Sequence, residues 1–215
     1  MKFQNFILSI FISILLLNGC SHDSEVDEFN KPAIYWYEQI AKSIDAHNID
    51  KADNYYISLK SEHIQSPLMK TAIMMLANAH INKEEYKLAN FYFEEYEKRY
   101  GDSSNKEYID FMKLKASFLG IHDVFKDQQL ILDSIDKALV YAQNYPNSQY
   151  IPIVDSILIR LYMSQYMLNE NIASLYERVG KEKASKMYRD KNKDSIIKNS
   201  DIKTPPKTII GKILD

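Results

Sequence analysis

Histidines are the first side chains in this sequence to consider for metal binding or proton transfer. His47, His63, His80 and His122 are scattered along the chain, and none has a second histidine at a spacing that would share one helix face. A metal ion therefore finds no local set of ligands. We expect most of these histidines to lie at helix ends or on the surface.

The acidic pairs and the glycines also give little support for catalysis. Glu84-Glu85 and Glu94-Glu95 are predicted to face solvent, opposite an apolar stripe, where a carboxyl group has no burial to shift its pKa. With five Gly in 215 residues, the chain has neither a Gly-x-Ser-x-Gly turn nor a phosphate-cradling loop. We predict no catalytic residue, no metal and no cofactor. The enzymatic alternative, a cell-wall hydrolase, needs a carbohydrate site that the sequence does not show.

Cys20 is the residue with the clearest chemical prediction. It is the one cysteine of the chain, so no intramolecular disulfide can form. It follows an apolar run, residues 6–17, that has the length of a signal-peptide core and is too short to span a bilayer. Leu17-Asn18-Gly19-Cys20 resembles the bacterial lipobox, in which the cysteine is acylated and becomes the first mature residue. We expect a lipid anchor at Cys20; the alternative is an ordinary signal peptide followed by a free thiol.

Charge divides the chain into an acidic body and a basic end. Residues 20–180 hold 16 Lys and Arg against 24 Asp and Glu, whereas residues 181–215 hold 10 against 5. A basic end can contact an anionic membrane surface or an acidic protein, or remain a solvated tail. Because the signal peptide directs the chain out of the cytoplasm, we predict no nucleic-acid partner.

The body is predicted to be helical. Five Gly and six Pro are too few for an all-β chain with its frequent turns. Apolar residues instead recur at helical spacing, in segments separated by short polar breaks. The predicted helices are residues 32–47, 50–64, 67–81, 84–100, 105–119, 127–145, 152–180 and 181–191. In the long helix over 152–180, a heptad-like seam through Leu161, Leu168, Leu175 and Val179 is predicted to be buried.

These helices form pairs that repeat along the chain. Trp36 precedes Ala52 by 16 residues, and Ile73 precedes Ala89 by the same interval, so the two units superimpose with a 37-residue period. A large residue in one helix and a small one in the next are typical of the tetratricopeptide repeat (TPR), which has two antiparallel helices in about 34 residues. A third unit carries an insertion near Gly120. The sequence predicts an all-α TPR right-handed superhelix of about four helical hairpins.

Four segments of the body carry more specific motifs. They are Tyr108-Ile109-Asp110-Phe111-Met112-Lys113, Asp127-Gln128, Tyr145-Pro146-Asn147-Ser148-Gln149-Tyr150 and the end of the long helix, residues 168–180. These segments resemble the BamD family of outer-membrane assembly lipoproteins. The resemblance implies a periplasmic scaffold that binds the barrel-forming BamA subunit, other assembly lipoproteins and unfolded outer-membrane proteins.

The resemblance also implies which residues contact partners. The family usually has a fifth repeat after the glycine that ends the long helix, whereas residues 181–191 here lead into a Lys-rich tail. Only the end of the long helix is therefore carried over as a partner-binding surface, through Glu177 and Arg178. The N-terminal groove that receives client segments in the family would be lined by Tyr35, Tyr55, Met74 and Asn78.

The predicted organisation has four parts. Residues 1–19 form a lipoprotein signal peptide, 20–30 a polar linker, 31–191 the TPR-like domain and 192–215 a basic, flexible tail. The predicted function is that of a non-enzymatic adaptor, lipid-anchored on the periplasmic face of the outer membrane, in the β-barrel assembly (BAM) complex. The alternative keeps the fold and makes the chain a TPR lipoprotein that organises a different periplasmic or cell-envelope complex.

Labelling of cells with radioactive palmitate tests the lipid anchor. We expect the wild-type chain to incorporate the label and Cys20→Ala to incorporate none, because the acyl groups attach through this cysteine. A wild-type chain that stays unlabelled, while other lipoproteins of the same cells are labelled, would contradict the prediction.

Overall fold

The structure, a computed structural model, describes residues 28–101, 104–193 and 195. The predicted signal peptide, Cys20 and residues 196–215 of the predicted tail lie outside the described residues. Eight helices are found in the described part, and all belong to one compact unit that begins at Pro32. They are α2 (Ala33–Asp45), α3 (Ile49–Glu62), α4 (Leu68–Asn82), α5 (Tyr86–Tyr100), α6 (Lys106–Leu119), α7 (Gln128–Asn144), α8 (Ile151–Arg178) and α9 (Glu182–Asp190). Every helix predicted from the sequence is present.

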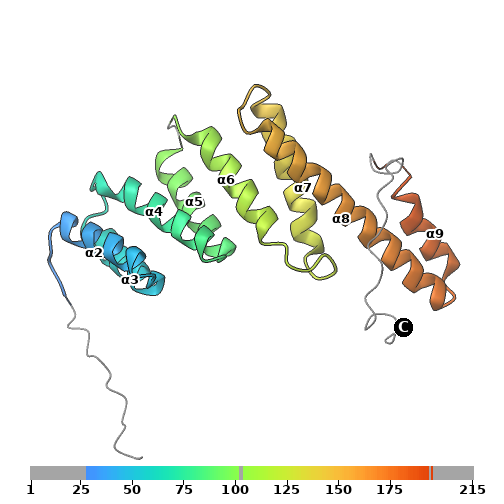
Figure 1. Cartoon of the computed structure of the whole chain (residues 1–215), viewed down its shortest axis with the longest axis horizontal. Coiled ribbons are helices and arrows are strands. Elements are labelled where there is room, and N and C mark those ends of the chain that lie inside the picture. Colours follow the sequence, from blue (N-terminus) through green and yellow to red (C-terminus); the bar gives the residue numbers. More distant parts are fainter. Residues whose placement is uncertain (1–27, 102–103, 194, 196–215) are drawn as a thin grey trace, which may run out of the picture. The chain divides into compact units, whose positions relative to one another are not determined.

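The helices pack as successive hairpins, each against the next along the chain (Figure 1). Within the hairpins, α2 packs on α3, α4 on α5, α6 on α7 and α8 on α9. Between hairpins, the second helix of one contacts the first helix of the next, and the first helices α2 and α4 also touch. The predicted all-α fold of TPR-type hairpins is confirmed.

The core forms where the repeat pattern places large and small residues. Trp36 and Ile73 on the first helices, and Ala52 and Ala89 on the second, are all buried. The alanines let the paired helices approach closely, and the large side chains fill the space between them. Because full burial of a large apolar side chain contributes about 1.5 to 3 kcal/mol, packing of these faces outweighs the helix propensity of any single hairpin.

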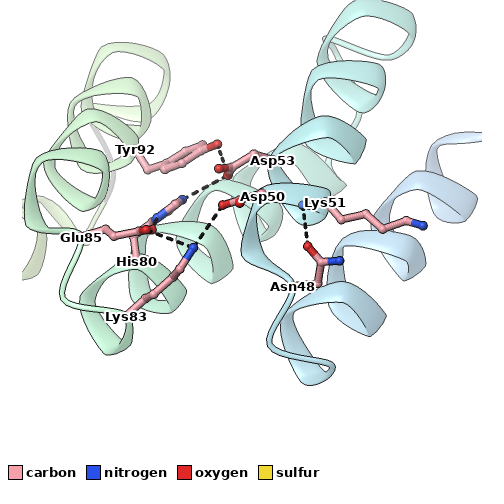
Figure 2. A network of polar contacts seen from close by, with 8 residues as sticks. All are labelled: Asn48, Asp50, Lys51, Asp53, His80, Lys83, Glu85 and Tyr92. Carbon is pink, nitrogen blue, oxygen red and sulfur yellow. Dashed lines mark hydrogen bonds and ion pairs between the residues drawn. The ribbon is translucent and has the colours of Figure 1, made fainter. Parts of the chain in front are cut away.

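The turns inside the first two hairpins repeat as well. His47 (φ 58°) and Glu84 (φ 62°) both adopt the left-handed backbone conformation and lie 37 residues apart, the same interval as the packing residues. At the first of these turns, the Asn48 side chain accepts a hydrogen bond from the Lys51 backbone N–H at 3.2 Å and so caps α3 (Figure 2). After α8, Gly180 takes φ 73° and ends the long helix, as the sequence predicted.

The predicted seam of α8 is wrong in its second half. Leu161 and Leu168 are buried, but Leu175 and Val179 are 50% and 58% exposed. The physical reason is that α9 packs on a different side of α8, the side that carries Tyr176, and leaves the side of Leu175 and Val179 exposed. The helix instead turns Asn169 and Ala173 inward.

The short helix α9 covers this last part of α8. The rings of Tyr176 and Tyr188 stack with centroids 5.7 Å apart. Asn192 is buried, and its amide nitrogen donates to the Tyr166 carbonyl at 3.1 Å while its oxygen accepts from Asn169 at 2.9 Å. Ordered structure therefore includes Asn192, with which the predicted flexible tail begins.

The two halves of α8 can be distinguished by one substitution in each. We expect Leu168→Asp to unfold α8 and α9, because it buries an unpaired charge and should cost more than about 3 kcal/mol. Leu175→Asp is the matched control and should change the free energy of unfolding by less than about 0.5 kcal/mol, since Leu175 is exposed. Chemical denaturation followed by circular dichroism measures both. Equal effects of the two substitutions would contradict this account of the seam.

Candidate functional site

A buried histidine joins the first two hairpins (Figure 2). His80, near the end of α4, is 0% exposed. Its Nε2 lies 3.1 Å from Oδ1 of Asp53 on α3, and its Nδ1 lies 2.7 Å from Oε2 of Glu85, which precedes α5. The imidazole is therefore held between carboxylates from two different hairpins.

Further polar contacts surround this histidine (Figure 2). The Tyr92 hydroxyl donates to Oδ1 of Asp53 at 2.6 Å, and its ring stacks on the imidazole with centroids 5.3 Å apart. Lys83 Nζ lies 3.1 Å from Oδ1 of Asp50 and 3.0 Å from Oε1 of Glu85. The cluster thus ties α3 to the turn between α4 and α5.

The cluster has a clear electrostatic consequence. Burial by itself would lower the pKa of His80, but the hydrogen bonds to Asp53 and Glu85 and the charges of these carboxylates raise it above its usual 6.5. Burial and the hydrogen bond to Asp53 raise the pKa of Tyr92. The network therefore favours a charged imidazole and a neutral phenol.

The expectation that most histidines lie at helix ends or on the surface agrees with the position of His80 in the last turn of α4, but it does not include the burial of this side chain. His47 and His122 are exposed and His63 is partly buried, but His80 lies in the core. Its partner Asp53 is 27 residues away, on a neighbouring hairpin. Sequence spacing within one helix cannot show such a contact. The repeat pattern could have indicated the burial of His80, because position 80 falls on the buried face of α4 beside Ala77.

The prediction that the acidic pairs face solvent is also wrong for one residue of each pair. Glu84 and Glu94 are exposed, but Glu85 is partly buried and the Glu95 side chain is only 8% exposed. Lys60 of α3 and Arg99 both reach Oε1 of Glu95, at 2.7 and 3.0 Å. Burial by itself would raise the pKa of Glu95, but these cations lower it. The reason is again the neighbouring hairpin, whose α3 covers this side of α5.

The four residues predicted to line a client groove are all partly buried. Two of them gather at the first hairpin, where the rings of Tyr35 and Tyr55 lie 5.2 and 6.0 Å from that of Trp36. The other two, Met74 and Asn78, lie one turn apart on α4, and the Asn78 amide donates to the Met74 carbonyl at 2.8 Å. Contacts therefore join these residues as two pairs, one on each of the first two hairpins.

The predicted partner residues lie at the end of α8. Both Glu177 and Arg178 are exposed, and Glu177 accepts a hydrogen bond from Arg189 of α9 at 2.5 Å. Glu177 thus helps to hold α9 against α8. Nearby, Leu175 and Val179 present exposed apolar side chains one helical turn apart. Sequence reasoning missed this apolar surface because it placed both residues in the core.

The motif residues of the third hairpin are structural. The Tyr145 hydroxyl donates to Asp110 at 2.8 Å, and burial together with this bond raises the pKa of Tyr145 to about 12. The Tyr150 ring stacks on Phe111 with centroids 4.3 Å apart. The Asp127 carboxylate accepts two backbone N–H groups of the preceding loop, both at 2.9 Å. These motifs therefore stabilise α6, α7 and the start of α8.

Within the part of the chain that the structure describes, no group of three or more His, Cys, Asp or Glu side chains could hold a metal ion. In that same part of the chain, no helix is both long enough and apolar enough to cross a membrane.

The array of helical hairpins places the chain in the TPR class of helical-repeat proteins. Residues 30–185 match YfiO, a family described as outer membrane lipoprotein. The chain is also 38% identical over 204 residues to the outer membrane protein assembly factor BamD of Helicobacter pylori, a match that covers 93% of each chain. The chain therefore belongs to this family of outer membrane lipoproteins. The predicted family and the lipid-anchored outer-membrane location are confirmed, while the attachment through Cys20 stays a prediction.

Proposed function

We propose that this chain is a non-enzymatic adaptor of outer-membrane β-barrel protein assembly. The observation that carries the proposal is sequence similarity to an assembly factor. The similarity extends along nearly the whole length of this chain and of that relative. The fold agrees with this role, because stacked hairpins offer extended rigid faces on which a protein or an extended peptide can lie. A lipid anchor would keep the array at the membrane and raise its local concentration there.

The end of α8 is the proposed surface for the BamA-like barrel subunit. Terminal repeats of an array usually turn a polar face outward, yet Leu175 and Val179 are exposed here beside Arg178. Exposed apolar residues next to a guanidinium group have the composition of an interface centre. Glu177 has a supporting role, since its bond to Arg189 positions α9.

The first two hairpins are the proposed surface for unfolded outer-membrane proteins. Partly buried Tyr35 and Tyr55 offer aromatic surface at the first hairpin, and Met74 offers a flexible side chain on α4. Such side chains accept apolar segments of varied sequence. Asn78 adds an amide that can bond to an extended backbone.

The partner surface predicts what is recovered with a C-terminally tagged chain from gently solubilised envelopes. We expect a large barrel protein with periplasmic domains to accompany the wild-type chain. Arg178→Glu should reduce its recovery at least about tenfold, or about 1.4 kcal/mol, because it reverses the charge at the proposed interface. Arg160→Glu, at another exposed position of α8, is the matched control and should leave recovery unchanged.

Two results of this purification would contradict the proposal. Undiminished capture by Arg178→Glu would show that the partner surface is wrong. Recovery of other envelope proteins without the barrel protein would favour the alternative, a TPR lipoprotein that organises a different complex.

The client surface predicts which positions cross-link to newly secreted outer-membrane proteins. We test one position from each pair of groove residues, 55 on the first hairpin and 74 on the second. A photoreactive residue at either position should form adducts with the secreted protein. A probe at Gln143, exposed on α7, should form none. Adducts at 143 but at neither 55 nor 74 would move the client surface away from the first two hairpins.

A further inference from the structure

The first two junctions between hairpins have a side-chain contact at equivalent positions of the repeat, but the residue types at these positions differ. Asp53 of α3 meets His80 of α4, and 37 residues later Asn90 of α5 meets Ser117 of α6. Each pair is separated by 27 residues, and each joins the second helix of one hairpin to the first helix of the next. The Asn90 amide donates to the Ser117 hydroxyl at 3.2 Å, and Lys137 of α7 donates to the same hydroxyl at 3.1 Å. Asn90 and Ser117 are therefore a neutral pair at the positions that Asp53 and His80 occupy in the first junction.

The geometry at the first junction requires a charged ring. Both nitrogens of His80 face carboxylate oxygens, at 2.7 and 3.1 Å. A neutral imidazole has one N–H group, so its other nitrogen would direct a lone pair at a carboxylate. Only the imidazolium donates to Asp53 and Glu85 at the same time. Because the ring is fully buried, no water can take the place of either partner.

We propose that His80 is a protonation-dependent clasp, which docks the first hairpin on the second while its ring is charged and loosens this junction when the proton leaves. The second junction has neither an imidazole nor a carboxylate at the equivalent contact, where Lys137 donates to the Ser117 hydroxyl, and it should not respond between pH 6 and pH 9. Of these two junctions, the one between α3 and α4 is thus the proton-sensitive one.

The groups that face this ring set the direction of the response. Asp50 and Asp53 approach from α3, Lys83 and Glu85 from the α4–α5 turn, and Tyr92 from α5. Since the carboxylates raise the folded pKa of His80 above 6.5, the clasp contributes its full stability below pH 6.5. That stability is lost as the pH rises through the raised folded pKa. The joint is therefore tighter in mild acid and looser in alkali.

The joint also connects the two parts of the proposed client surface. Tyr55 lies on α3 two residues after Asp53, whereas Met74 and Asn78 lie on α4 with His80. This consequence rests on the proposed function, but the clasp itself does not. Measurements without any client therefore test the clasp, and client cross-linking at a single pH tests the proposed function.

Two measurements on the full chain in detergent micelles test the clasp. The first is an NMR titration of the histidine rings, in which His80 should stay charged above pH 6.5, with exposed His47 as the internal reference. The second is amide hydrogen exchange, expressed as the protection of α2 and α3 relative to that of α6 and α7 in the same sample. This ratio should fall between pH 6 and pH 9, about tenfold for each unit by which the pKa of His80 exceeds 6.5.

Substitutions at the contact supply the controls. Asp53→Asn combined with His80→Ser copies the neutral pair of the second junction, and its protection ratio should not change with pH. Should that variant fail to fold, Asp53→Asn alone removes one carboxylate and should move the His80 titration to lower pH. A ring that is neutral at pH 6.5, or a wild-type ratio that is the same at pH 6 and pH 9, would overturn the proposal.

Discussion

The close approach of paired helices is the constraint on which the rest of this structure depends. Ala52, Ala89 and Ala138 are fully buried on the second helices of successive hairpins. Because a close-packed interior has no spare volume, a larger side chain at such a position would push the two helices apart. The fixed helix separation then determines where Trp36 and its repeat equivalents interlock, and so how one hairpin is placed on the next.

Polar residues add specificity to this apolar framework. A buried charge costs free energy unless it is paired and hydrogen-bonded, so the imidazole of His80 is compatible with the core only where Asp53 and Glu85 meet it. The same reasoning applies to Glu95, which is held by two cations. Such networks penalise any other register of the hairpins, because a shifted register would leave a charge buried without its partner.

The last hairpin shows how an array ends when its second helix is short. α8 has 28 residues and α9 has 9, so α9 can cover only part of α8. Buried Asn192 and the bond between Arg189 and Glu177 hold α9 in place. Leu175 and Val179 lie on a side of α8 that α9 does not cover, so their apolar side chains are exposed.

Features that depend on near neighbours in the chain were determined by the sequence alone. The helix bounds, the hairpin pairing, the burial of Trp36 and Ala52 and the family follow from helical spacing and short motifs, since both repeat within a few turns. Only the tertiary structure decided which polar residues are buried and which apolar ones are exposed. His80 finds its partner on another hairpin, and Leu175 lies on a side of α8 that α9 leaves exposed. The physical reason is that burial depends on what packs against a helix face from a distant part of the chain, which periodicity within that helix does not record.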